Sequence, residues 1–140
     1  MNRRTSAGRY AASIVVIASL LAGCASFDAV KQAHGQGVKR TFKQPYSVVF
    51  TAVMQAASRK NLEIVSSAPD SGTILLSGKA SLGSPGGERI AVFVIRLNDS
   101  ATSVEVVARP VIPTVSFPPD WPELLFGEIE ESLAEQRLPR

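Results

Sequence analysis

Cysteine and histidine each occur only once in this chain, as Cys24 and His34. A single cysteine excludes an intramolecular disulfide and a cysteine-rich metal cluster, so the stability of the fold must come from packing. The lone histidine lies among glycines, with no acidic neighbour in sequence to orient it as a general base or zinc ligand. We therefore expect His34 to be a solvated linker residue, and we predict no metal site, no cofactor and no enzymatic activity.

A long hydrophobic run is also missing, because the longest apolar stretch covers only residues 11–22. A helix needs about 20 apolar residues to cross the hydrocarbon core of a bilayer. The stretch follows Arg3, Arg4 and Arg9, with no acidic residue before it. A positive segment followed by a short apolar one is typical of an export signal. We predict that residues 1–23 are a cleaved signal peptide.

The end of this stretch, Leu21-Ala22-Gly23-Cys24, resembles the lipobox of bacterial lipoproteins at every position. The resemblance implies that the Cys24 thiol is joined to a diacylglycerol, that cleavage falls between Gly23 and Cys24, and that the new amino terminus is acylated. Two or three acyl chains make a stable membrane anchor, whereas one would be marginal. The alternative is a structural cysteine that happens to follow an apolar stretch.

The residues after Cys24 bear on its destination. Ala25 and Ser26 follow it, without an aspartate. In enteric-type bacteria the resemblance then implies sorting to the outer membrane, facing the periplasm. The pair Arg3-Arg4 leaves twin-arginine export open, although Thr5 and the two residues after it fit ordinary unfolded export better.

An excess of one charge is missing once the signal is removed. Three of the 15 basic residues lie in residues 1–23 and none of the 12 acidic ones does, which leaves 12 of each. Nucleic-acid binding needs a basic surface. We therefore expect no nucleic-acid partner. The protein is expected to bind the membrane through the lipid on Cys24.

Residues 24–40 are mostly small and polar, without a sustained apolar period. Such a composition is typical of a flexible tether. Fully extended, it would reach roughly 50 Å from the bilayer. Residues 41–140 are then enough for a single domain with one core.

Within residues 41–140, hydrophobic periodicity and turn residues predict the order β-α-β-β-β-β-α. Pro45 is expected at the first position of the first helix, and Asp120 is expected to cap the last one. Residues 88–97 are apolar on both faces and predict a central strand. Residues 102–109 alternate, so we expect Ser103, Glu105 and Arg109 on a wet face. The expected elements are strand 41–43, helix 45–61, strands 62–66, 73–77, 88–97 and 102–109, and helix 120–137.

These elements predict an α+β fold, a curved antiparallel sheet of four to five strands packed with two helices. The element order, and residues 42–74 with their Asp-Ser-Gly-Thr turn, resemble the helix-grip architecture of small bacterial lipoproteins. Among these is a lipoprotein subunit of the outer-membrane barrel assembly machinery. This resemblance implies an envelope role and carries no functional residue other than Cys24.

Prolines crowd residues 110–122, where Val115, Phe117 and Trp121 lie among them. A stiff extended segment with aromatic side chains can dock on a partner at low entropic cost. The alternative is that these side chains fold back and staple the start of the last helix.

Two other patterns favour structural interpretations. Glu128, Glu131 and Glu135 are expected on the solvated side of the last helix, and a carboxylate face that binds a cation or a basic partner is the alternative. Residues 83–87 are expected to form a mobile loop, because they lack the lysine and spacing of a phosphate-binding loop.

The function predicted from these observations is a lipid-anchored, non-enzymatic module that binds an envelope protein during envelope maintenance or assembly. A carrier of a small apolar ligand, held between the sheet and the C-terminal helix, is the alternative.

Overall fold

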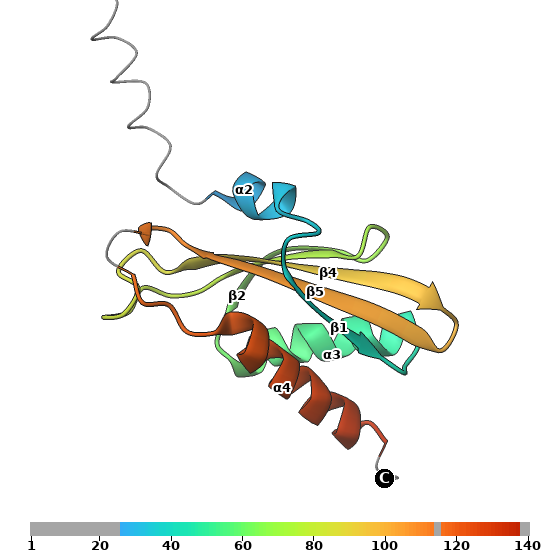
Figure 1. Cartoon of the computed structure of the whole chain (residues 1–140). Helices are drawn as coiled ribbons and strands as arrows, with labels where there is room; N and C mark the ends of the chain where they lie inside the picture. The colour runs from blue at the N-terminus through green and yellow to red at the C-terminus, as the bar shows by residue number, and fades with distance from the viewer. Residues whose placement is uncertain (1–25, 114–115, 138–140) are drawn as a thin grey trace, which may run out of the picture.

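The computed structural model describes residues 26–113 and 116–137 (Figure 1). The predicted signal peptide, Gly23, Cys24 and Val115 lie outside the described residues. The elements are α2 (Phe27–Gln32), β1 (Val38–Phe42), α3 (Tyr46–Arg59), β2 (Glu63–Ala68), β3 (Thr73–Ser77), β4 (Glu88–Asn98), β5 (Ala101–Pro110) and α4 (Trp121–Glu135).

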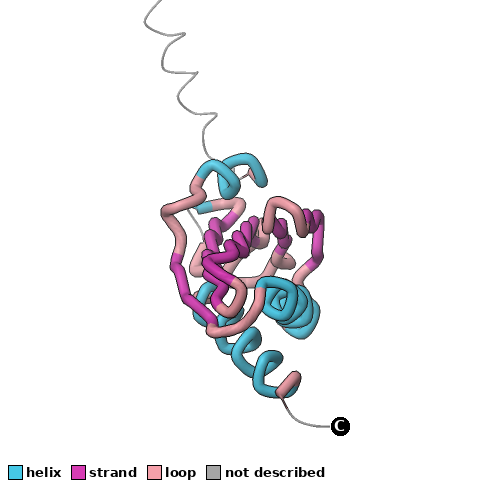
Figure 2. The backbone as a smooth tube through the Cα atoms, turned by 90° about the vertical axis from the view of Figure 1, so that its right-hand side faces the viewer, coloured by secondary structure: helices cyan, strands magenta, loops and turns pink. Residues whose placement is uncertain are grey.

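The five strands form one antiparallel sheet in the order β1-β5-β4-β3-β2. The two longer helices, α3 and α4, pack side by side on one face, and α2 lies on the other face (Figure 2). This arrangement confirms the predicted α+β fold, and the order from β1 to α4 is the predicted one. We call the face under α3 and α4 the inner face and the face under α2 the outer face.

Two ends of the sheet differ in their connections (Figure 1). The loop end carries the β3–β4 loop and the segment between β5 and α4. The turn end carries the β2–β3 turn and the β4–β5 turn. In Figure 1 the loop end is at the left of the sheet and the turn end is at the right.

The main core lies between the inner face and the two long helices. Strand β4 contributes Ile90, Val92 and Val94 to it, and β5 contributes Val104 and Val106, all at most 2% exposed. On the other face of β4, Ala91 and Phe93 are also buried. Burial on both faces confirms β4 as a central strand.

The predicted tether is wrong for the described part of residues 24–40. Residues 27–32 form α2, capped by the Ser26 side chain, which accepts a hydrogen bond from the Ala29 amide at 3.2 Å. Val30 is fully buried and Ala33 is 4% exposed. Strand β1 begins at Val38 rather than at residue 41, because residues 38–42 pair with the edge of β5. The segment is thus part of the domain.

This packing also corrects the predicted wet face of β5. Glu105 is fully buried and Val107 is 5% exposed, because α2 and the segment after it cover the outer face there. Ser103 is half-buried, and Arg109 is exposed as predicted. The sheet is covered on both faces over part of its area.

Helix α4 begins as predicted, with the Asp120 carboxylate accepting a hydrogen bond from the Glu123 amide at 3.3 Å. Of its glutamates, Glu131 and Glu135 are exposed as predicted, whereas the Glu128 side chain is only 17% exposed. Glu135 pairs with Arg59, and Glu128 lies 2.7 Å from the Lys60 ammonium group. Two of the three predicted glutamates therefore join α4 to α3.

Glycines 72 and 127 provide a matched test of this fold. Gly72 has a φ of 71°, and a Cβ atom there would lie 2.0 Å from the Val94 carbonyl oxygen. Gly127 lies inside α4, with open space around an added Cβ. Gly72→Ala is expected to lower the free energy of unfolding by about 2 kcal/mol or more. Gly127→Ala is expected to raise it by up to about 1 kcal/mol.

Urea denaturation of the two variants measures both effects. Equal changes in the free energy of unfolding of the two variants would contradict the close approach of the β2–β3 turn to β4 at Gly72.

Candidate functional site

Strand β4 runs beyond β3 at the turn end of the sheet. The last β3 pair joins Thr73 to Phe93, and the Val94 amide then donates to the Gly72 carbonyl at 2.8 Å. From Ile95 to Asn98, β4 pairs only with β5 within the described part of the chain. The other edge of β4 is therefore open over these residues.

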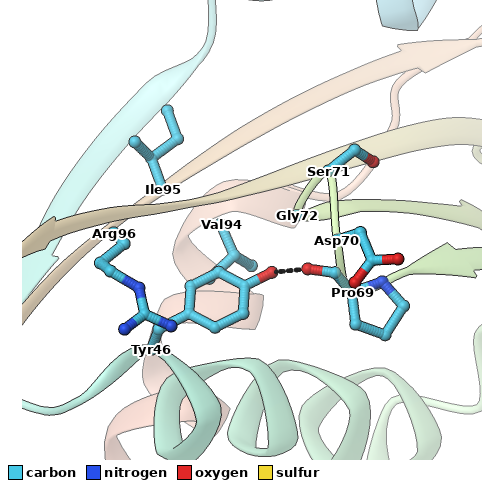
Figure 3. Close-up of a pocket in the computed structure, with 8 residues that line it drawn as sticks. All are labelled: Tyr46, Pro69, Asp70, Ser71, Gly72, Val94, Ile95 and Arg96. Carbon is cyan, nitrogen blue, oxygen red and sulfur yellow. Dashed lines mark hydrogen bonds between the residues drawn. The ribbon is translucent and has the colours of Figure 1, made fainter.

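A hollow of about 510 Å³ lies beside this open edge (Figure 3). Helix α3 contributes Tyr46 at its first turn, and β4 contributes Arg96 on the inner face. The Arg96 guanidinium carbon lies 5.3 Å from the centre of the Tyr46 ring, a cation–π contact. The hollow is lined by Tyr46, Pro69, Asp70, Ser71, Gly72, Val94, Ile95 and Arg96.

The Tyr46 hydroxyl donates a hydrogen bond to the Pro69 carbonyl and so holds the β2–β3 turn over the start of α3. Burial raises the pKa of Tyr46; Asp70 raises it further, and Arg96 opposes both. A hydroxyl with a raised pKa stays protonated at neutral pH and remains a donor. One side of the hollow is thereby fixed in place.

Arg96 and Asp70 give the hollow one charge of each sign. Both side chains are exposed, and neither forms an ion pair with another described residue. An arginine offers several donors and a carboxylate offers acceptors only. The arrangement can bind a polar chain through side chains and through the open edge of β4. Among residues 26–113 and 116–137, no group of three metal-ligating side chains occurs.

A second polar cluster lies on the outer face, around Glu105. One carboxylate oxygen accepts hydrogen bonds from the amides of Gly35 and Gly37, at 2.7 and 2.8 Å. The other is buried without a hydrogen bond, with His34 Nε2 at 3.6 Å and Lys39 Nζ at 3.8 Å. We call this cluster the Glu105 clasp, because it fastens the segment between α2 and β1 to the sheet.

His34 is exposed, as predicted, but it does not belong to a flexible linker. Its ring packs against Phe93 at 4.3 Å between centres, and about half of its side chain is buried. Sequence reasoning missed this position because Glu105 lies 71 residues away in the chain. The clasp is structural, since the carboxylate is committed to backbone amides.

The predicted partner surface divides into two parts. Trp121 is half-buried and packs against the main core, as the staple interpretation expects. Phe117 is 87% exposed, and its amide donates to the Gly83 carbonyl at 2.5 Å. The residues of the predicted mobile loop thus contact the segment before α4, and Ser84 in that loop is fully buried.

The space between the sheet and α4 is filled by Leu125, Phe126, Ile129 and Leu133, all at most 4% exposed. Near the start of α4, a hollow of about 150 Å³ lies between Glu88 and Trp121. Ligand pockets usually measure about 300–1,000 Å³. This hollow is small for the apolar ligand of the carrier hypothesis.

No helix of the described ranges is long and apolar enough to cross a membrane. No protein-family model matches the chain, and no curated protein matches its sequence. Among solved structures, the chain is similar to the adenylate sensor from AMP-activated protein kinase in complex with the nucleotide ZMP. The match has 15% identity and a TM-score of 0.49, and it covers 70% of this chain and 94% of that one.

The Glu105 clasp can be tested by substitution. Glu105→Ala removes two part-buried hydrogen bonds from backbone amides to a carboxylate, and a hydrogen bond to a charged group contributes about 1.5–3 kcal/mol. We expect the free energy of unfolding to fall by about 2–4 kcal/mol, measured by urea denaturation. Glu131→Ala, an exposed glutamate on α4, is the control and should change it by less than about 0.5 kcal/mol. Similar changes in the two variants would show that the Glu105 clasp contributes nothing to the free energy of unfolding.

Proposed function

We propose that this chain is a lipid-anchored, non-enzymatic interaction module of a bacterial envelope. It is exported, cut before Cys24, acylated there and held at the outer membrane facing the periplasm. Support comes from the arginines of the first nine residues, the short apolar run and the lipobox-like residues Leu21 to Cys24. Its partner is an envelope protein.

The observation that carries the interaction role is the hollow beside the open edge of β4. An extended peptide can add to such an edge, where backbone hydrogen bonds supply affinity and side-chain pockets supply specificity. The charges of Arg96 and Asp70 can provide this specificity, and the ring of Tyr46 forms an aromatic wall of the hollow. The partner therefore offers an extended segment with at least one acidic side chain, which pairs with Arg96.

The geometry gives less support to a carrier of a small apolar ligand. Buried side chains fill the space between the sheet and α4, and the hollow at the start of α4 measures only about 150 Å³. The larger hollow beside Tyr46 is open and carries charged groups. Surface recognition of a peptide fits these features better than enclosure of an apolar molecule.

The anchor is tested by Cys24→Ser. Without the thiol no diacylglycerol can be attached, so the protein is expected to remain uncleaved or to leave the membrane fraction. Intact-mass measurement and membrane fractionation of wild type and variant report this directly. A variant that still fractionates with the membrane, at the same mass apart from the substitution, would contradict lipid attachment at Cys24.

The partner site is tested by placing a photo-reactive amino acid at Ser71, which lines the hollow and is exposed. In-cell cross-linking is expected to give one dominant envelope-protein adduct, whereas the same group at Glu131 on α4 gives none. Arg96→Glu should reduce that adduct about tenfold by reversing a charge that faces the partner.

Arg109→Glu is the matched control, since Arg109 is exposed on the neighbouring strand at the loop end. Equal adduct yields in the Arg96 and Arg109 variants would contradict binding in the hollow.

A further inference from the structure

The path of α2 places the N-terminal end of the domain at the loop end of the sheet. Phe27, the first residue of α2, lies under the Arg89 guanidinium group, at 5.1 Å from the ring centre. Arg89 is the second residue of β4 and follows the β3–β4 loop. From there α2 runs along the outer face toward Phe93, where the Glu105 clasp holds the next segment (Figure 1).

The chain between the expected anchor and this fixed helix is short. Only Ala25 and Ser26 separate Cys24 from Phe27. Three Cα–Cα steps of about 3.8 Å span at most about 11 Å. An acylated Cys24 would therefore hold the loop end close to the bilayer, in place of the roughly 50 Å separation of a flexible tether.

The loop end also exposes its largest apolar side chains to solvent. Leu82 in the β3–β4 loop is fully exposed, and Phe117 before α4 is 87% exposed. The Phe117 amide donates to the Gly83 carbonyl, so these two loops lie side by side. Leaving both side chains in water is costly, since each would gain from transfer to an apolar environment.

The charges of these loops are compatible with a lipid surface. Residues 79–87, 111–113 and 116–120 contain one basic and one acidic side chain, Lys79 and Asp120, and the Asp120 carboxylate accepts a hydrogen bond from the Glu123 amide at the start of α4. Lysine near a headgroup layer is attracted to anionic lipids, and aromatic and aliphatic side chains enter the boundary below it. An acidic loop would instead be repelled.

We propose that Leu82 and Phe117 insert into the headgroup boundary of the leaflet that holds the lipid on Cys24. The inference rests on the proposed anchoring and adds the orientation of the domain to it. With the loop end on the membrane, the turn end of the sheet, where the hollow beside Tyr46 lies, is the end farther from the bilayer (Figure 1). Phe117 then contacts lipid and not the protein partner.

The single cysteine makes this orientation measurable in the full-length, acylated protein. Because acylation occupies the Cys24 thiol, Leu82→Cys, Phe117→Cys and Ser100→Cys each introduce the one free thiol of the chain. Each variant is labelled with a polarity-sensitive fluorophore and reconstituted into phosphatidylethanolamine–phosphatidylglycerol vesicles that contain a spin-labelled lipid. Ser100 lies in the β4–β5 turn and is exposed, so it is the matched control.

We expect blue-shifted emission and at least threefold stronger quenching by spin-labelled lipid at positions 82 and 117 than at position 100. Equal emission and quenching at the three positions, in protein whose mass shows acylation and which floats with the vesicles, would overturn the orientation and leave the anchor standing. Shielding of positions 82 and 117 only after an envelope protein is added would likewise overturn it in favour of a protein interface.

Failure of the anchor gives a different result. An unmodified Cys24 by intact mass, with protein that does not float, would overturn the proposed anchoring and this inference together.

Discussion

One buried carboxylate determines how the N-terminal segment joins the rest of the domain. Glu105 accepts hydrogen bonds from the amides of Gly35 and Gly37, and α2 packs on the same face through Val30. A Cβ atom on Gly37 would lie 2.5 Å from the Val106 carbonyl oxygen, so only glycine allows this approach. Removing the carboxylate would lose both hydrogen bonds at once and leave α2 held on the sheet by the apolar packing of Val30 and Ala33.

The two ends of the sheet lie on either side of the clasp. On one side of it, α2 leads back to Phe27 and the loop end, where Leu82 and Phe117 are exposed. On the other side, β4 extends past β3 and leaves an open edge beside Tyr46. The proposed membrane contact and the proposed partner site thus lie at opposite ends of the same sheet. A flexible tether of residues 24–40 would have left this orientation undefined.

The sequence predicted the parts of the fold that depend on long periodic segments. The strands of residues 73–77, 88–97 and 102–109 and both long helices are at or within a few residues of their predicted positions. It did not predict α2, because six residues are too few for a helical period to stand out. The burial of Glu105 depends on glycines about 70 positions away, and the hollow beside Arg96 depends on where β3 ends relative to β4. Neither relation is visible in local sequence, and Cys24 lies outside the described residues.

The open edge of β4 persists because the turn before β3 is fixed from two directions. The Val94 amide is bonded to the Gly72 carbonyl, and the Tyr46 hydroxyl holds Pro69 from the start of α3. The turn therefore cannot slide along β4 and cover Ile95 to Asn98. An exposed edge invites unwanted pairing, which proteins limit by keeping edges short and charged. Four residues carrying Arg96 meet both conditions, so the proposed partner would have to supply a matching charge as well as an extended backbone.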